Sequence, residues 1–265
     1  IRSVNRGLAI ARDRLGPVVL LNTDALVPIN WAPRLLAPLS DPTVASVTPL
    51  SNNAEIFGAP LPCVPFALPQ GQADWMDAVA SGLGLPKPLA DMPTGVGFCM
   101  ALSRRWLGRI PQLDTGFGRG YGEEVDWCRR VIALGGRHVA QTRLFVEHRG
   151  GVSFGPEKAA RLKGTNAEIC RRYPAYDAEV QACLTDDPLR TPRMALAVAA
   201  AGAAASEAGA ALPMYLGHAL GGGAEEALRR EVSHDLAELG AALVLRVGTA
   251  YRWRLEVHLP QGVLM

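Results

Sequence analysis

The sequence predicts an α/β fold built on a mostly parallel sheet with flanking helices. Two short runs, 18–21 (Val-Val-Leu-Leu) and 44–50, are continuously apolar, as expected of strands buried on both faces of such a sheet. Segments with helical spacing lie at 5–15, before the first run, and at 31–39, between the two. Strands that alternate with helices are typical of α/β domains with parallel sheets.

The same patterns continue toward the middle of the chain. Residues 51–73 are rich in Pro, Gly and Asn, which predicts a long irregular surface loop, and loops of that length are usually functional or mobile. We expect further helices at 74–83, after residue 122 and at 156–173, and strands at 97–102 and within 137–148.

The composition changes after residue 186, which predicts three parts. We expect a partial α/β domain over 1–186, an Ala/Gly/Pro-rich linker or loosely specified helix over 187–211, and the first βα unit of a second α/β domain over 212–265. In the last part we expect a strand at 212–220, a helix at 224–239 after the triglycine 221–223, and a strand at 242–247.

Charge and cysteine content exclude several classes of protein. The net charge is only +2, and Lys and Arg are scattered, so no nucleic-acid partner is indicated. The five cysteines are odd in number and lack Cys-x-x-Cys spacing, which predicts reduced, mostly buried thiols in a cytoplasmic protein. The longest apolar run, 194–205, is too short to span a bilayer. Because the chain begins with Ile1, we expect a fragment or a processed product.

The most informative segment is the glycine-rich stretch 114–122, which leads directly into Glu123, Glu124 and Asp126. These acids would occupy the first turn of a helix, where the positive end of the helix dipole favours anions. Such a cluster suits a general base, or a site that handles hydroxyl groups or a metal. The alternative is that acids are simply common at helix starts.

Two further polar residues follow apolar runs. Asp24 comes after the run 18–21, and His148 ends an apolar stretch. Separately, Asp24 could be a helix cap and His148 a hydrogen-bonded edge histidine. Together, a carboxylate and an imidazole could hold a divalent cation, with positions left for phosphate oxygens and water.

These pieces occur in an order that resembles family 2 glycosyltransferases with the GT-A fold. Residues 3–9 resemble that family's Asn-x-Gly helix, and 20–24 its Asp-x-Asp element in the Asn-x-Asp form. Residues 97–105 resemble the strand before its acceptor site, and 117–130 its Glu-Asp-Val-Asp-x-Cys-x-Arg block. The resemblance covers about residues 3–155.

The resemblance implies a role for each matching position. Asp24 would bind the metal and the diphosphate, with His148 as the second protein ligand. Glu124, where the family often has Asp, would be the base that deprotonates the acceptor hydroxyl, and Glu123 would hold sugar hydroxyls. The further substrate-binding positions implied are Asn5, Asn22 and Trp127, although Trp127 could instead belong to the core. Asp126 would fix the helix and the neighbouring Arg129 or Arg130.

The implied activity is inverting transfer of a sugar from a nucleoside-diphosphate donor to a glycan or glycolipid hydroxyl, assisted by Mg²⁺ or Mn²⁺. A glycolipid acceptor would bring peripheral membrane association. The strands that grip the nucleotide in this family would precede Asn5, so the resemblance implies an N-terminal truncation of roughly seventy to ninety residues.

Residues 213–225 resemble the opening of a family 4 glycosyltransferase, which has the GT-B fold. In that family a Gly-Gly loop at a helix N-terminus lets backbone amides approach a substrate or a phosphate. A flexible triglycine is the alternative. For the whole chain, two other functions remain open: a metal-dependent hydrolase that uses Glu124 to activate water, and a non-catalytic glycan-binding remnant.

Overall fold

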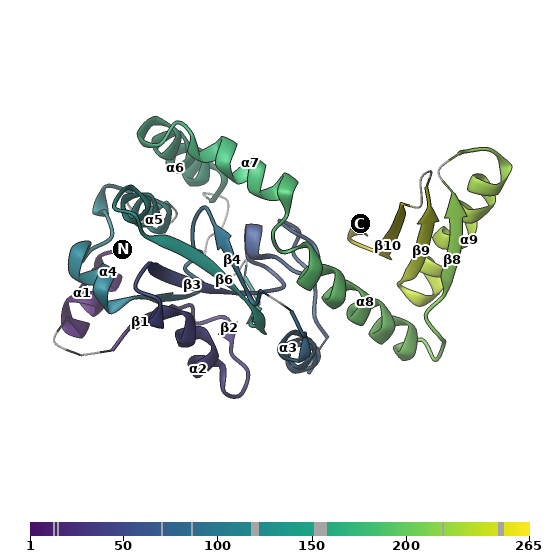
Figure 1. Cartoon of the computed structure of the whole chain (residues 1–265), viewed down its shortest axis with the longest axis horizontal. Coiled ribbons are helices and arrows are strands. Elements are labelled where there is room, and N and C mark those ends of the chain that lie inside the picture. Colours follow the sequence, from purple (N-terminus) through teal and green to yellow (C-terminus); the bar gives the residue numbers. More distant parts are fainter. Residues whose placement is uncertain are drawn as a thin grey trace.

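The computed structural model describes residues 1–12, 14, 16–69, 71–85, 87–117, 122–150, 158–218, 220–248 and 252–265. The described strands form a five-stranded sheet in the order β1-β5-β3-β6-β4, a four-stranded sheet in the order β11-β10-β9-β8, and a small β2-β7 ladder. Figure 1 shows the two larger sheets at opposite ends of helix α8. The α/β class predicted from the sequence is therefore confirmed.

The first sheet is made of β1 (Val18–Leu21), β3 (Val44–Leu50), β4 (Leu89–Met92), β5 (Cys99–Leu102) and β6 (Arg137–Phe145). The small ladder pairs β2 (Ala25–Leu26) with β7 (Glu147–His148). The helices of this part are α1 (Arg2–Ala11), α2 (Trp31–Leu36), α3 (Gln72–Gly82), α4 (Arg104–Arg109), α5 (Glu123–Ala133), α6 (Lys158–Arg172) and α7 (Tyr176–Asp186), with 3₁₀ turns η1 (Ala37–Ser40), η2 (Glu55–Phe57) and η3 (Thr115–Phe117).

The strand directions differ from the expected mostly parallel arrangement. In the first sheet only β3 and β6 pair in parallel, whereas β1–β5, β5–β3 and β4–β6 are antiparallel. An apolar run does not encode direction, because a strand covered on both faces is continuously apolar in either orientation. The sheet is mixed.

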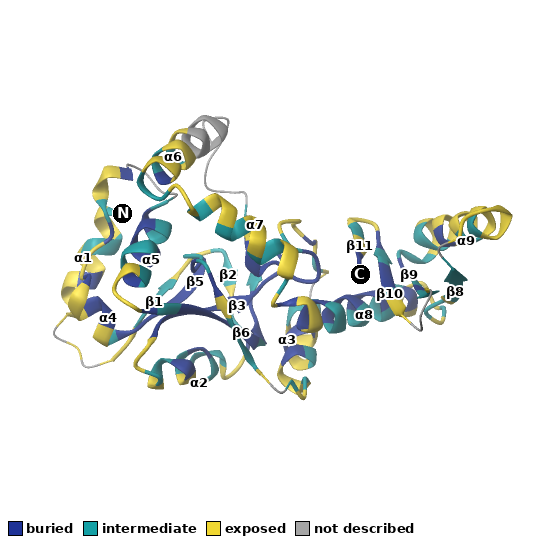
Figure 2. Cartoon of the chain, turned by 45° about the horizontal axis from the view of Figure 1, so that its top comes forward, coloured by how far each residue is buried: buried dark blue, intermediate teal, exposed yellow. Residues whose placement is uncertain are grey.

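Burial follows the position of each strand in the sheet. All seven residues of the central strand β3 are buried, whereas β1 lies at an edge and its Leu21 is 43% exposed. Helices α2 and α3 contribute to one core cluster and α4 and α5 to another, which brackets the sheet between two helical layers (Figure 2). The run 18–21 is therefore only partly buried, with Val19 packed against one cluster and Val18 and Leu20 against the other.

The expected surface loop at 51–73 is only partly observed: residues 62–69 are irregular and mostly exposed, whereas the part directly after β3 is buried. Most side chains from Ser51 to Leu61 are buried, and Phe57 is fully so. Backbone hydrogen bonds fold it back on itself, from the Ser51 N–H to the Phe57 carbonyl (3.2 Å) and from the Ala59 N–H to the Ser51 carbonyl (2.8 Å). Internal pairing of this kind lets an irregular segment be buried without unsatisfied backbone groups.

Of the two alternatives for the Ala-rich segment after residue 186, a linker or a helix, the structure has the helix: α8 spans Arg190–Glu207. Its buried face includes Leu196, Ala197, Ala200 and Ala201, in the helical spacing that places side chains on one side. These residues share one core cluster with α3 and with Val257 of the second sheet. Helix α8 therefore packs against both sheets.

The C-terminal part contains β8 (Met214–His218), α9 (Gly223–Leu239), β9 (Ala242–Val247), β10 (Trp253–Leu259) and β11 (Gly262–Leu264). Strands β8 and β9 pair in parallel around α9, whereas β10 and β11 add antiparallel strands that the sequence patterns did not predict.

Two composition-based expectations can be compared with the structure. All five cysteines are free, as expected, but only Cys99 and Cys128 are buried, whereas Cys63 and Cys170 are exposed. Among the described residues, none of the helices combines the length and apolarity that crossing a membrane requires.

Candidate functional site

Asp24 and His148 lie side by side, although 124 positions separate them in the sequence. The β2–β7 ladder pairs Ala25 with His148 and so carries the preceding Asp24 to the histidine ring. The Asp24 Oδ1 and His148 Nε2 atoms are 3.5 Å apart, and both side chains are partly exposed. The two residues paired on sequence grounds are therefore neighbours at one accessible point.

The orientation of the His148 ring is fixed by hydrogen bonds. Its Nδ1 lies 2.6 Å from the Asn53 carbonyl, which can only accept, so Nδ1 carries the proton and donates. In the neutral ring Nε2 is then the unprotonated nitrogen; it faces Asp24 and lies 3.4 Å from the amide nitrogen of Asn22. The ring also stacks on Phe98, with 5.1 Å between centroids.

This pair suits a divalent cation in its donor chemistry. One carboxylate oxygen and one unprotonated imidazole nitrogen are standard ligands of Mn²⁺ and related ions. Two ligands about 2.1 Å from one cation lie about 3.0 Å apart at a right angle and about 3.4 Å apart at a tetrahedral angle, close to the observed Nε2–Oδ1 separation of 3.5 Å. Among the described residues no third His, Cys, Asp or Glu joins the pair, so water or substrate oxygens would supply the remaining positions.

The second part of the site is the beginning of α5. Gly122 precedes the helix with φ 90°, a left-handed conformation that glycine adopts without strain. A Cβ atom there would lie 2.4 Å from Thr165 Cγ2, so a side chain is also excluded sterically. Gly118, Gly120 and the residues beside them, 118–121, lie outside the described residues.

Glu123 and Glu124 begin α5 in an environment that disfavours their charged forms. Burial, reinforced by the neighbouring Glu123 carboxylate, raises the pKa of Glu124 to about 7. Burial also raises the pKa of Glu123, whose Oε2 has no hydrogen-bond partner among the described residues. A carboxylate whose pKa lies near neutrality can take up and release protons at physiological pH, as a general base requires.

The dipeptide Gly97–Phe98 connects the two parts of the site. A Cβ on Gly97 would lie 2.3 Å from Glu124 Oε1, so the Glu124 carboxylate rests directly on the Gly97 backbone. The next residue, Phe98, stacks on His148, and its carbonyl accepts the Asn22 N–H at 2.8 Å. Two adjacent residues therefore contact the candidate base and a candidate metal ligand, Gly97 the former and Phe98 the latter.

The contact at Gly97 gives a prediction. Gly97→Ala is expected to displace the Glu124 side chain, to destabilise the fold by about 1–3 kcal/mol and to impair any reaction that depends on Glu124. Urea unfolding and turnover would be measured together. Gly108→Ala is the matched control, because a Cβ there meets nothing within 4 Å in the exposed interior of α4, where alanine favours the helix by about 0.5–1 kcal/mol. Equal effects at both positions would contradict the assigned contact.

Helix α6 holds both sides of the glycine-rich stretch. The Arg172 guanidinium binds Asp114 (2.6 Å), the first residue of the stretch, and Asp126 (3.0 Å) after it. Asp126 also accepts from the Tyr173 hydroxyl (2.8 Å) and from Arg130 (2.8 Å). Asp126 thus anchors the helix, as its position in the sequence indicated, whereas Arg172 and Tyr173 gave no sequence signal because their partners lie about fifty residues away.

Two proposed substrate-binding residues have structural roles instead. Trp127 is fully buried and its indole N–H donates to the Ile110 carbonyl (2.9 Å), so it belongs to the core and cannot stack on a sugar. The Asn5 amide bonds both to the Leu113 carbonyl and to the Leu113 N–H, each at 2.8 Å. Asn5 therefore fixes the backbone at Leu113, directly before the glycine-rich stretch. Asn22 alone remains beside the metal pair.

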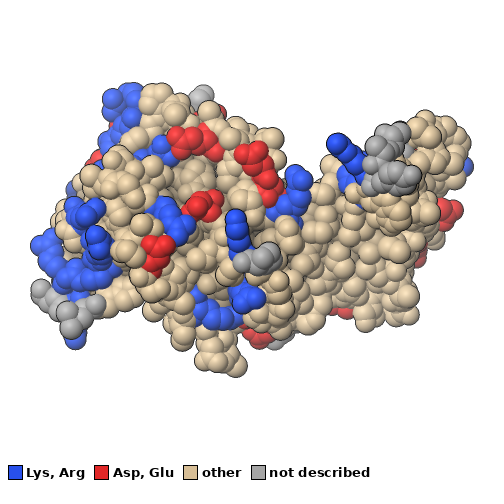
Figure 3. All heavy atoms as spheres, in the orientation of Figure 1, with Lys and Arg blue, Asp and Glu red and all other residues tan. Residues whose placement is uncertain are grey.

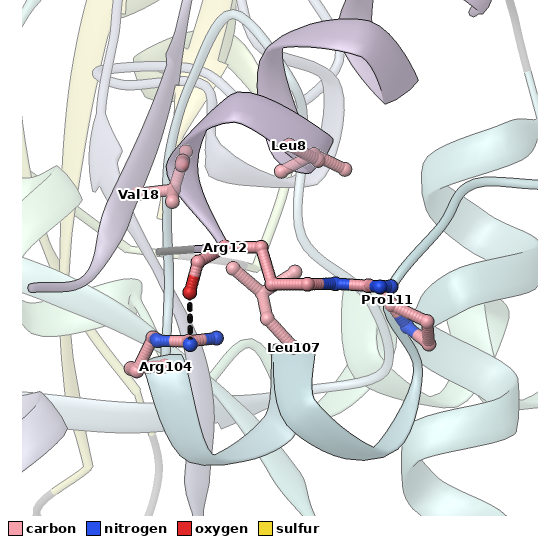
Figure 4. A pocket seen from close by; sticks show the side chains of 7 residues that line it. Leu8, Arg12, Val18, Arg104, Leu107 and Pro111 are labelled. Atoms are coloured by element: carbon pink, nitrogen blue, oxygen red, sulfur yellow. Dashed lines mark hydrogen bonds between the residues drawn. The ribbon is translucent and has the colours of Figure 1, made fainter. Parts of the chain in front are cut away.

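A small cavity elsewhere offers no substrate site. It lies between α1 and α4, where Arg104 donates to the backbone carbonyl of Arg12 beside Leu107 (Figure 4). Its volume of about 10 Å³ is room for about one water molecule.

Comparisons with known proteins return only distant structural likenesses. No family model and no curated protein matches the chain. Among solved structures, the chain is similar to the crystal structure of GalNAc-T7 with UDP, GalNAc and Mn²⁺, at 15% sequence identity and a TM-score of 0.39. The match covers 55% of this chain and 30% of that chain. The chain thus spans less than a third of the neighbour's length, and its own activity and substrates are proposals.

Proposed function

We propose that this chain belongs to an inverting glycosyltransferase and carries its acceptor-activating and metal-binding residues. The observation that carries the proposal is the Glu124 carboxylate, whose pKa is about 7, resting on Gly97 while the adjacent Phe98 stacks on His148. A base near neutrality beside a carboxylate–imidazole pair suits proton removal from a hydroxyl next to a phosphate leaving group. The sequence resemblance to family 2 glycosyltransferases independently favours the same roles.

In the proposed reaction, Glu124 accepts the proton of the acceptor hydroxyl. The hydroxyl oxygen forms a bond to the anomeric carbon of the donor sugar as the bond from that carbon to the phosphate oxygen breaks. The nucleoside diphosphate departs from the opposite face, which inverts the anomeric carbon. Asp24 and His148 would hold Mn²⁺ or Mg²⁺, which would neutralise charge on the departing diphosphate. Glu123 would accept hydrogen bonds from sugar hydroxyls.

The test is metal-dependent donor binding and transfer by the protein. The chain is titrated with UDP- and dTDP-sugars with and without Mn²⁺, and NMR of any product reports the anomeric configuration. Metal-dependent binding and an inverted product support the proposal. Hydrolysis of a phosphoester without donor binding would instead indicate a metal-dependent hydrolase. Binding of glycans alone, without turnover, would indicate a non-catalytic glycan-binding remnant.

We also propose that the domain limits follow the division 1–186, 187–211 and 212–265, with a partial GT-A domain first and a GT-B-like unit last. What supports this division is the separation of two sheets by α8, and the parallel β8–α9–β9 unit with Gly221–Gly223 before its helix. The five free cysteines favour a cytoplasmic location. Independent folding of 187–265, which keeps α8 because it packs against the second sheet, would be measured by proton NMR and would test the boundary at residue 186.

Peripheral membrane association has support from an arginine-rich surface on α1, α4 and their flanks. Figure 3 shows Lys and Arg side chains gathered at the end of the molecule where α1 and α4 lie. Segments 1–17 and 103–113 hold seven arginines and one acid, Asp13, and exposed Ile10 lies on α1 among them. None of the seven forms an ion pair with another described residue. We propose that this arginine surface binds anionic lipid headgroups.

Vesicle sedimentation tests this surface. Vesicles of phosphatidylglycerol and phosphatidylcholine are expected to bind the chain, and Arg2→Ala, Arg6→Ala and Arg105→Ala together to weaken binding on the order of 100-fold, at about 1 kcal/mol per arginine. The matched control removes two exposed arginines of α9, Arg229 and Arg230. Equal binding to pure phosphatidylcholine vesicles would contradict the proposal.

A further inference from the structure

Helix α8 contributes a buried cation, Arg193, whose side chain is 2% exposed. Its Nη1 forms an ion pair with Asp187, its Nε donates to the Gly58 carbonyl (2.8 Å), and its Nη2 donates to the Ile56 carbonyl (2.6 Å). Burying a guanidinium is costly unless its charge and its donors are satisfied, and here all three nitrogens have partners. Two of those partners are backbone carbonyls of a single short segment.

That segment, residues 51–58, also holds His148. The Asn53 carbonyl accepts from His148 Nδ1 (2.6 Å), and the Asn52 side chain accepts the His148 N–H (2.8 Å) and donates to its carbonyl (3.3 Å). Because Ser51 pairs with the backbone of Phe57, the part held by Arg193 and the part that holds His148 form one hydrogen-bonded unit. We call this unit the 51–58 strap.

We propose that Arg193 is a positioning residue that keeps His148 in its metal-binding tautomer. By fixing the carbonyls of Ile56 and Gly58, Arg193 keeps the 51–58 strap in the conformation that places the Asn53 carbonyl on Nδ1. The proton therefore stays on Nδ1, and Nε2 remains free to face Asp24. Without this acceptor the ring exchanges between its two neutral tautomers. The proposal rests on the metal role of His148 in the proposed function, but its first test does not.

The first test measures the ring itself, without metal. The ¹⁵N chemical shifts of His148 are expected to report a protonated Nδ1 and an unprotonated Nε2 in the wild-type chain at pH 8, and averaged values in Arg193→Met and Arg193→Lys. Arg190→Met is the matched control, because Arg190 lies on the same helix but is exposed. Its shifts are expected to equal those of the wild type.

The second test is Mn²⁺ binding by calorimetry. Arg193→Lys is expected to bind Mn²⁺ about tenfold more weakly, since residues that orient a metal ligand change affinity by about 10–100-fold. If Arg193→Met fails to fold, as circular dichroism would report, Asp187→Asn loosens the same guanidinium while keeping its donors buried. Unchanged ring shifts in folded Arg193→Lys and Asp187→Asn would overturn the proposal.

The two proposals fail in different ways. If the wild-type chain binds no Mn²⁺ while its ring shifts still depend on Arg193, the positioning role stands and the metal assignment is wrong. If Mn²⁺ binds with equal affinity to the wild type and to both folded variants, the metal assignment stands and the role of Arg193 is wrong.

Discussion

Glu124→Gln is expected to lower the turnover number for sugar transfer by about 10²–10⁴-fold, the usual contribution of a positioned general base. Glutamine keeps the size of the side chain and its contact with Gly97 but cannot accept the proton of the acceptor hydroxyl. Because burial raises the pKa of Glu124 to about 7, the wild-type rate should rise with pH through that value, as the active carboxylate forms. The glutamine variant should lack this rise.

The same substitution should increase the stability of the fold while it lowers the turnover number, so stability is an independent measurement. Glu124 has a higher pKa in the folded than in the unfolded state. Its contribution to the stability of the fold is therefore fully present below its pKa in the unfolded state and is lost as pH rises through about 7. Glu124→Gln should therefore raise the free energy of unfolding at pH 8, by at most about 3 kcal/mol, and change it little at pH 4. Urea unfolding at both pH values measures this difference.

Exposed Glu226 in the first turn of α9 supplies the control, because its conversion to glutamine removes only a favourable helix-dipole interaction and should not raise the free energy of unfolding at either pH value. A Glu124→Gln protein that retains transfer, or whose stability gain is the same at pH 4 and pH 8, would show that Glu124 is not the base.

Asp24→Ala is expected to weaken Mn²⁺ binding by more than about 100-fold, because it removes a ligand and not merely a residue that orients one. His148 alone would remain, held by Asn53 and Phe98, and one imidazole binds such ions weakly. Any binding of UDP-sugars should then lose its dependence on Mn²⁺. Calorimetric titration with the metal, the nucleotide and both together measures these effects.

Asp74→Ala is the matched control for this titration, because Asp74 is an exposed carboxylate at the start of α3. Mn²⁺ affinity that is unchanged in Asp24→Ala, or reduced equally in both variants, would exclude the Asp24–His148 pair as the metal site.

Much of the fold could be predicted because local patterns specify strands and helices. The observed β3 and β9 have the expected bounds, 44–50 and 242–247, and α5 begins where the acids cluster. Strand direction could not be predicted, since each apolar run is compatible with both orientations. Strand β1 was expected to be buried on both faces but is only partly buried, because it lies at the edge of the sheet and position in a sheet depends on distant partners.

The candidate site, like the fold, could be predicted only in part. The expectation that Asp24 and His148 act together agrees with their proximity, and it came from the order of the motifs, not from either residue alone. Arg193 and Arg172 could not be found in this way, because each acts on residues far away in the sequence. Trp127 lies in the core, the alternative that the sequence left open, and Asn5 bonds to Leu113; neither contact could be predicted, because a motif gives the position of a residue but not the direction in which its side chain points.

The Gly97–Phe98 dipeptide has a consequence for how this site can vary. Consecutive Cα atoms across a trans peptide are about 3.8 Å apart, and this length does not depend on packing. The backbone beneath the Glu124 carboxylate and the ring that supports His148 are therefore separated by a covalent spacer. Surrounding loops and helices can therefore change in sequence or position without changing the spacing between these two supports. Glu124 contacts Gly97 and His148 stacks on Phe98, and these two residues are adjacent in the chain.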